Sequence, residues 1–169
     1  SGMRKLLFQS DDYGLTDSVA DGILKGIDQG IIRNTGLFVN MPSSARAAEK
    51  IRDRQGICVG IDINLVAGQP VSDPAEVPSL VNPEGHFVPS VQRMREGRII
   101  GRQGMCLCFE EDPYDFEQTL LETDNQVKRF IELMGRKPDY FHGHSMATPN
   151  TQRAARAIAE KYDILMTTD

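Results

Sequence analysis

The regular alternation of short apolar stretches with helix-like stretches is the feature that most constrains the fold of this chain. Stretches typical of strands cover residues 6–8, 35–40, 57–65, 140–144 and 164–168, and stretches typical of helices cover 16–30, 45–54, 113–134 and 151–162. Strands that alternate with helices form parallel sheets, because each helix returns the chain over the sheet in a right-handed crossover. The sequence therefore predicts an α/β fold with its strands in chain order.

The alternation fails between residues 67 and 112. Prolines and glycines interrupt this segment repeatedly, and a short basic helix over residues 91–102 is the regular element that we predict within it. Loops of this length inside a compact domain are usually functional lids or disordered segments. We therefore expect residues 67–112 to form a lid over the carboxyl ends of the strands.

Composition places the chain among globular proteins and narrows its partners. The chain has 169 residues and a net charge of -5, which argues against nucleic-acid binding and leaves a neutral sugar open as a ligand. No apolar stretch has membrane-spanning length, so we expect no membrane partner. Three cysteines without metal-ligand spacing favour a reducing cytoplasm, and we interpret Cys106 and Cys108 as buried small apolar residues.

Two adjacent carboxylates, Asp11 and Asp12, follow the apolar stretch 6–8 and precede Gly14. Neighbouring carboxylates repel each other, and a divalent cation is the usual means of offsetting that cost. The carboxyl end of a strand is also where parallel α/β folds place their chemistry. The alternative is an Asp-rich turn in which one carboxylate caps the next helix.

Further polar side chains occur near the ends of the other predicted strands. They are Asn40, Asp62, Asn64, His142 and His144. His142 and His144 are two residues apart, so they point to the same side if the stretch is extended. Carboxylates and imidazoles are ligands for divalent ions, and in a parallel sheet these strand ends meet at one edge. The alternatives are structural histidines bonded to the backbone, and asparagines that cap loops.

Several ordered motifs resemble the YdjC-like carbohydrate deacetylases. Ser10-Asp11-Asp12-Tyr13-Gly14-Leu15 is similar to the Asp-Asp-Phe-Gly-Leu opening of that family. The resemblance continues along almost the whole chain in the segments Gly30-Ile31-Ile32-Arg33-Asn34-Thr35, Asn40-Met41-Pro42, Pro78-Ser79-Leu80-Val81, Gly85-His86-Phe87 and Phe130-Ile131-Glu132-Leu133 with Gly135-Arg136-Lys137-Pro138.

The resemblance implies a TIM-barrel-like parallel β/α barrel, incomplete in this chain, formed by a single domain over residues 3–169. It also implies metal-dependent hydrolysis of N-acetyl groups on an amino sugar or chitooligosaccharide. Carried over by position, Asp12 matches the metal-binding aspartate, Asp11 the general base and His144 a metal-binding histidine.

The chain departs from the family pattern at several positions, and Ser145, Met146 and Thr148 stand where the family has its later histidines. Asp62 stands where the family has its other metal-binding histidine, and His142 stands where it has an aspartate. The ligand set would then be Asp12, Asp62, His142 and His144, and its two carboxylates favour Mg²⁺, with Mn²⁺ or Zn²⁺ as alternatives. Thr167 stands near the end of the last strand, where the family has an arginine.

In the mechanism that the resemblance implies, a carboxylate takes a proton from water while the metal polarises the acetyl carbonyl. Asn40 and Asn64 are the candidate contacts to sugar hydroxyls.

Two other functions stay open: a metal-independent glycosidase using Asp11 and Asp62, and a catalytically impaired sugar-binding relative. We expect a small carbohydrate as the substrate and leave a homo-oligomer open.

Overall fold

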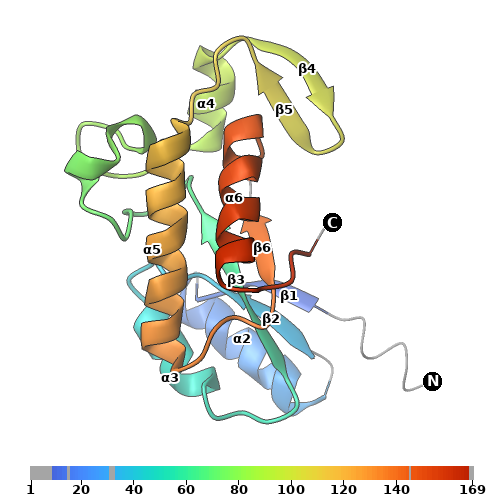
Figure 1. The fold of residues 1–169 in the computed structure, drawn as a ribbon. Helices are drawn as coiled ribbons and strands as arrows, with labels where there is room; N and C mark the ends of the chain where they lie inside the picture. Colours follow the sequence, from blue (N-terminus) through green and yellow to red (C-terminus); the bar gives the residue numbers. More distant parts are fainter. Residues whose placement is uncertain (1–8, 15, 31–32, 145, 168–169) are drawn as a thin grey trace. The chain divides into compact units, whose positions relative to one another are not determined.

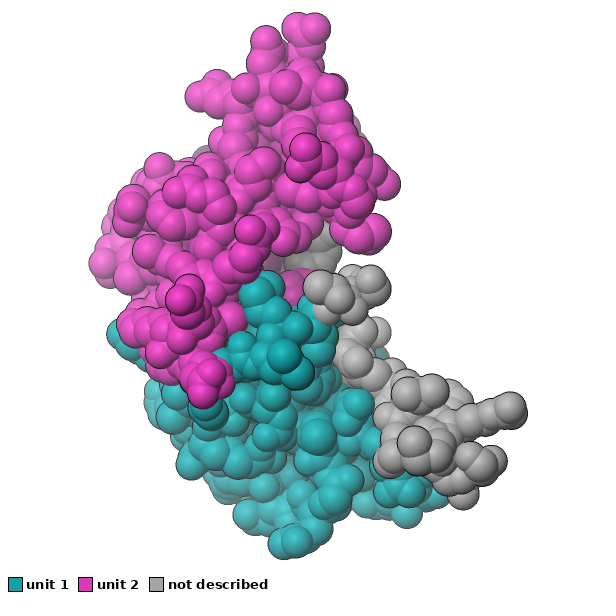
Figure 2. Space-filling model, turned by 45° about the vertical axis from the view of Figure 1, so that its right-hand side comes forward, with its two compact units in different colours: residues 1–62, 127–142, 164–169 teal, residues 63–126, 143–163 magenta. Residues whose placement is uncertain are grey.

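The computed structural model describes residues 9–14, 16–30, 33–144 and 146–167, and describes residues 9–13 and 144 through their backbone alone. The strand predicted at 6–8 lies outside the described residues. The chain divides into two compact units (Figure 2). Unit 1 comprises residues 1–62, 127–142 and 164–169, and unit 2 comprises residues 63–126 and 143–163.

A parallel sheet carries the chain order that the sequence predicts. Its strands are β1 (Gln9–Tyr13), β2 (Asn34–Leu37), β3 (Cys58–Asn64) and β6 (Phe141–His144), hydrogen-bonded in the order β1-β2-β3-β6 (Figure 1). A parallel bridge between Phe141 and Met166 is what the described residues show of the strand expected at 164–168. The α/β class is therefore confirmed, although the last strand is shorter than predicted.

The helices α2 (Asp17–Asp28) and α3 (Ser44–Ile51) belong to unit 1 and agree closely with the predicted stretches 16–30 and 45–54. The Thr16 hydroxyl caps α2 by accepting a hydrogen bond from the Val19 amide at 3.2 Å. Apolar side chains of these helices and of the sheet form the core of unit 1. They include Ala20, Ile23, Leu24, Leu37, Ala47, Ala48, Ile51, Val59, Ile61 and Phe141, and they are joined by Phe38 and Val39 just after β2 and by Phe130 of the long helix over residues 116–134.

Surface ion pairs join α2 to α3 and the turn after it. Arg46 contacts Asp17 at 2.5 Å and Lys50 contacts Asp21 at 3.1 Å. The hydrogen bond from the Arg46 guanidinium lowers the pKa of the Asp17 carboxyl below its ordinary value. These side chains are largely exposed, so we expect the pairs to orient the helices more than to stabilise the fold.

Unit 2 contains η1 (Pro74–Glu76), η2 (Pro78–Leu80), α4 (Ser90–Glu96), β4 (Ile99–Gln103), β5 (Cys106–Phe109) and α6 (Pro149–Lys161). The long helix α5 (Phe116–Met134) contributes its first part to unit 2 and its last part to unit 1. The buried apolar residues of unit 2 include Leu65, Val77, Leu80, Phe87, Leu107, Phe109, Tyr114, Met146, Ala154 and Ile158. Within the described residues, no helix is long and apolar enough to cross a membrane.

The helix predicted over residues 91–102 is wrong in its second half. The helix α4 ends at Glu96, and the chain continues as the antiparallel hairpin β4–β5. A Cβ atom at Gly97 would lie 2.6 Å from the Phe109 ring, so a glycine is needed where the chain leaves the helix. Gly104 turns the hairpin with a φ of 59°, a conformation that glycine adopts readily.

The interpretation of Cys106 and Cys108 as buried residues is also wrong. Both are half-buried, because the alternation along β5 directs Leu107 and Phe109 into unit 2 instead. The two thiols therefore share the more exposed face of the hairpin strand.

Candidate functional site

The carboxyl end of β1 is fixed by a glycine against the neighbouring strand segment. Gly14 has a φ of 89°, and a Cβ atom there would lie 2.9 Å from the Phe38 carbonyl oxygen. The Ser43 hydroxyl donates a hydrogen bond to the Gly14 carbonyl at 2.9 Å. Only glycine allows this close backbone approach, so the turn after the predicted aspartate pair has a defined position.

The ladder between β1 and β2 is irregular where the aspartate pair lies. Its register shifts between Ser10 and Tyr13, the interval that contains Asp11 and Asp12. Irregularities of this kind are common beside active sites, where they redirect side chains. The side chains of Asp11 and Asp12 lie outside the described residues, so their roles as base and metal ligand stay predictions.

The strands β3 and β6 place Asp62 beside His142. The Ile61 amide donates to the Tyr140 carbonyl at 3.0 Å, which sets Ile61 opposite Phe141 and Asp62 opposite His142 in a parallel ladder. These positions belong to unit 1. Two of the predicted ligands therefore occupy adjacent positions on one face of the sheet.

Glycines on the neighbouring strands make room for this face. A Cβ atom at Gly36 of β2 would lie 2.5 Å from the Asp62 carboxyl group, and one at Gly60 would lie 2.4 Å from the Tyr140 ring. Asp62 is 0% exposed. The Asp62 carboxylate therefore occupies space over Gly36 that any other residue at that position would fill.

The segment after α6 places Thr167 next to His142, so that Asp62, His142 and Thr167 form a row across the sheet. The Phe141 amide donates to Leu165 at 2.8 Å and the Phe141 carbonyl accepts from the Thr167 amide at 2.9 Å, which sets Thr167 beside His142. The Thr167 hydroxyl lies 3.1 Å from Nδ1 of His142, which is only 7% exposed. Asp62, His142 and Thr167 thus lie side by side on three neighbouring chain segments.

The remaining predicted residues differ in how much the structure says of them. His144 ends β6, and its side chain lies outside the described residues. Asn40 is half-buried beyond the end of β2. Asn64 is 1% exposed, and its side-chain oxygen Oδ1 accepts hydrogen bonds from the backbone amides of Val66 and Ala67 at 3.0 and 3.1 Å. These bonds support the loop-capping alternative for Asn64, and its contact to substrate stays a prediction.

The donor set suits a divalent cation. Among the described side chains, no group of three His, Cys, Asp or Glu residues surrounds a common point. Asp62 and His142 nevertheless provide an oxygen and a nitrogen donor side by side, with little exposure to water. Carboxylate and imidazole are the ligand types that Mg²⁺, Mn²⁺ and Zn²⁺ accept, so the residues present fit such an ion.

A ladder of polar side chains on α5 was not predicted. The carboxylate of Glu122, 0% exposed, accepts hydrogen bonds from the Val71 amide at 3.0 Å, the Ser72 amide at 2.8 Å and the Ser72 hydroxyl at 2.7 Å. Gln118 of the same helix accepts from the Ser79 amide at 2.7 Å. The first part of the predicted lid is therefore bonded along its backbone to a helix of unit 2.

Gln126 continues this ladder one turn further along α5. It accepts from the Asn64 amide at 3.2 Å and donates to the Asn64 carbonyl at 2.8 Å, as a neighbouring strand would do. Gln126 also donates to Glu122 at 2.8 Å. Polar residues at every fourth position, 118, 122 and 126, were the available signal, but the same spacing is typical of an exposed helix face.

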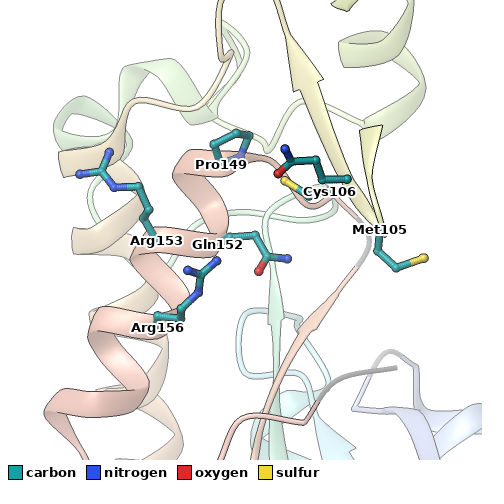
Figure 3. A pocket seen from close by; sticks show the side chains of 7 residues that line it. Met105, Cys106, Pro149, Gln152, Arg153 and Arg156 are labelled. Carbon is teal, nitrogen blue, oxygen red and sulfur yellow. The ribbon is translucent and has the colours of Figure 1, made fainter. Parts of the chain in front are cut away.

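A surface groove lies in unit 2 and contains none of the predicted site residues. It has a volume of about 320 Å³ and is lined by Gln103, Met105, Cys106, Pro149, Gln152, Arg153 and Arg156 (Figure 3). Burial raises the pKa of the Cys106 thiol, and the neighbouring Cys108 and Asp112 raise it further while Arg156 lowers it. A raised pKa keeps the thiol protonated, which argues against a nucleophilic role for Cys106.

Several proteins similar to this chain are named deacetylases. Carbohydrate deacetylase 2 of Listeria innocua is 28% identical over 163 residues, which are 95% of this chain and 58% of that protein. Carbohydrate deacetylase of Geobacillus stearothermophilus is 31% identical over 94% of this chain and 57% of its own length. Chitooligosaccharide deacetylase of Escherichia fergusonii is 31% identical over 83% of this chain and 49% of its own. The chain thus spans little more than half the length of the first two relatives.

A solved structure shares the fold. A protein of Enterococcus faecalis, described as a cellobiose-phosphate cleavage protein, superposes with a TM-score of 0.78 and 23% identity. The superposition covers 94% of this chain and 56% of that protein. A model of the YdjC-like protein family matches residues 5–168, and on that match over nearly the whole sequence the chain belongs to the YdjC-like family.

Proposed function

We propose that this protein is a carbohydrate deacetylase that hydrolyses the N-acetyl group of an amino sugar or a chitooligosaccharide. The observation that carries the proposal is the pair Asp62 and His142, side by side on one face of the parallel sheet and nearly excluded from water. The relatives named carbohydrate deacetylase and chitooligosaccharide deacetylase supply the reaction class.

Four side chains would hold a divalent ion, with Mg²⁺ as the first choice and Mn²⁺ or Zn²⁺ as alternatives. They are Asp12, Asp62, His142 and His144. When bound, such an ion withdraws electrons from the acetyl carbonyl and makes its carbon more electrophilic. Asp11 would take a proton from the attacking water, and Asn40 would orient a sugar hydroxyl group.

We also propose the finer description of the fold, a TIM-barrel-like β/α barrel. The chain order of β1, β2, β3 and β6, with helices between them, supports this proposal. A position of residues 67–112 over the strand ends, a cytoplasmic location and a homo-oligomer are parts of the same hypothesis. A crystal structure with bound sugar would test the barrel and the lid.

The decisive experiment measures acetate release from N-acetylglucosamine oligomers with and without added divalent ions. Acetate that appears only with the ion supports the proposal. Cleavage of glycosidic bonds without acetate or metal would favour the two-carboxylate glycosidase. Sugar binding without either reaction would favour the impaired sugar-binding relative.

Two aspartate variants separate the proposed roles. Asp12→Asn should abolish binding of the divalent ion, because the substitution removes a charged ligand. Asp11→Asn should retain ion binding but stop acetate release, because an amide cannot take the proton from water. Calorimetry and the acetate assay on both variants measure these effects. Equal loss of ion binding in the two variants would contradict this division of roles.

A further inference from the structure

His142 has two ring nitrogens, and its chemistry depends on which of them carries the proton. A neutral imidazole donates from one nitrogen and accepts at the other, so the partner of one nitrogen determines what the other can do. In this structure Nδ1 of His142 lies 3.1 Å from the Thr167 hydroxyl. The direction of that hydrogen bond therefore contributes to the choice of tautomer.

The Thr167 hydroxyl has a second, longer contact that favours one direction. It donates to the carbonyl oxygen of Phe141 at 3.4 Å. A hydroxyl group has a single proton to donate and two lone pairs with which to accept. With its proton directed to Phe141, the hydroxyl accepts from His142, so Nδ1 carries a hydrogen.

The backbone holds Thr167 in the position that this requires. The Thr167 amide donates to the Phe141 carbonyl at 2.9 Å, and Met166 forms a parallel bridge with Phe141. His142 is 7% exposed, so little water competes for its ring. Thr167 thus lies in the same row across the sheet as Asp62 and His142.

We propose that Thr167 is a positioning residue that keeps the proton of His142 on Nδ1 and so makes Nε2 the nitrogen that binds the divalent ion. The first half of this proposal is argued from the two contacts of the Thr167 hydroxyl. The second half rests on the proposed function. Residues that hold the second nitrogen of a metal-binding histidine orient the ring and strengthen the ligand.

Nitrogen-15 NMR of the histidine rings tests the tautomer directly in the metal-free protein. The measurement is made at pH 8.5 for the wild type and for every variant. His142→Gln identifies the signals of His142 among those of the three histidines. We expect a protonated, pyrrole-type Nδ1 and an unprotonated, pyridine-type Nε2. The reverse assignment in the wild-type protein would overturn the proposal.

Two variants of Thr167 and one control show whether the hydroxyl is responsible. Thr167→Val keeps the shape but removes the acceptor, so the proton should move partly or wholly to Nε2. Thr167→Ser keeps the hydroxyl and should restore the wild-type pattern. Thr119→Val is the matched control: the Thr119 hydroxyl in α5 is buried and has no hydrogen-bond partner among the described residues, so its loss should leave the His142 signals unchanged. A wild-type pattern in Thr167→Val would refute the role of Thr167.

Binding of Zn²⁺, which is diamagnetic, tests the second half. Added Zn²⁺ should shift Nε2 of His142 while Nδ1 stays protonated, and Thr167→Val should weaken Zn²⁺ binding by about 10- to 100-fold. Zn²⁺ affinity equal to that of the wild type would overturn the positioning role. The acetate assay stays separate: the expected tautomer without acetate release would leave this inference intact and refute the proposed function.

Discussion

Gly36→Ala should damage the candidate site through a single added carbon atom. The new Cβ would lie 2.5 Å from the Asp62 carboxyl group, whereas ordinary contact begins near 3.4 Å, so the atoms must separate by about 0.9 Å. Both residues are buried, and Asp62 is 0% exposed, so neither has free space to enter. Overpacking of this kind costs about 1–3 kcal/mol in the free energy of unfolding.

Urea unfolding measures this cost. With a slope of about 2 kcal/mol per molar urea for a chain of this size, the midpoint should fall by about 0.5–1.5 M. Gly22→Ala is the matched control, since a Cβ at Gly22 meets nothing within 4 Å and the residue lies inside α2. Alanine is the better helix former by about 1 kcal/mol, so the control should become more stable.

The double variant Gly36→Ala with Asp62→Ala identifies the cause of the loss. If the clash with the carboxyl group is responsible, Gly36→Ala should cost less than about 0.5 kcal/mol once Asp62 is alanine. The coupling energy would then equal most of the original loss. An unchanged cost in the Asp62→Ala background, or a Gly36→Ala variant as stable as the wild type, would refute the reasoning.

Two further predictions concern unit 2. Glu122→Gln should lower the free energy of unfolding by about 2–4 kcal/mol, measured by urea unfolding, because Val71 and Ser72 donate to different oxygens of the carboxylate and glutamine replaces one of these oxygens with an NH2 group that cannot accept. A loss of unfolding free energy below about 0.5 kcal/mol would contradict a stabilising role of the Glu122 hydrogen bonds. Burial, and then the hydrogen bond to Asp124, raise the pKa of Tyr162 to about 12. The neutral phenol therefore contributes stability below about pH 10 that is lost as pH rises through about 12. An absorbance titration should show this late ionisation, and Asp124→Asn should move it to lower pH.

The elements were readable from the sequence because they are local. The helices at 16–30, 45–54, 113–134 and 151–162 appear as α2, α3, α5 and α6, since an apolar stripe and a cap act over a few residues. The helix expected at 91–102 failed for a reason that is not local. Gly97 faces Phe109, and the strand that follows needs β5 as its partner.

The long segment 67–112 likewise has features that follow from local sequence and contacts that do not. Its prolines and glycines correctly excluded a continuation of the alternating pattern. They did not show that Glu122 and Gln118 would bond its backbone. A polar residue at every fourth position of a helix has the same pattern whether it faces water or a buried loop.

The sequence alone determined which residue types stand at the strand ends, the α/β class and the chain order of the strands, because these follow from periodicity and from the ordered motifs. Only the tertiary structure decided which of these residues are neighbours. Ladder register set Asp62 opposite His142, the absence of a side chain at Gly36 gave the carboxylate its space, and the bridge at Met166 brought Thr167 to Nδ1. Register and close packing depend on residues far apart in the chain, so no local pattern contains them.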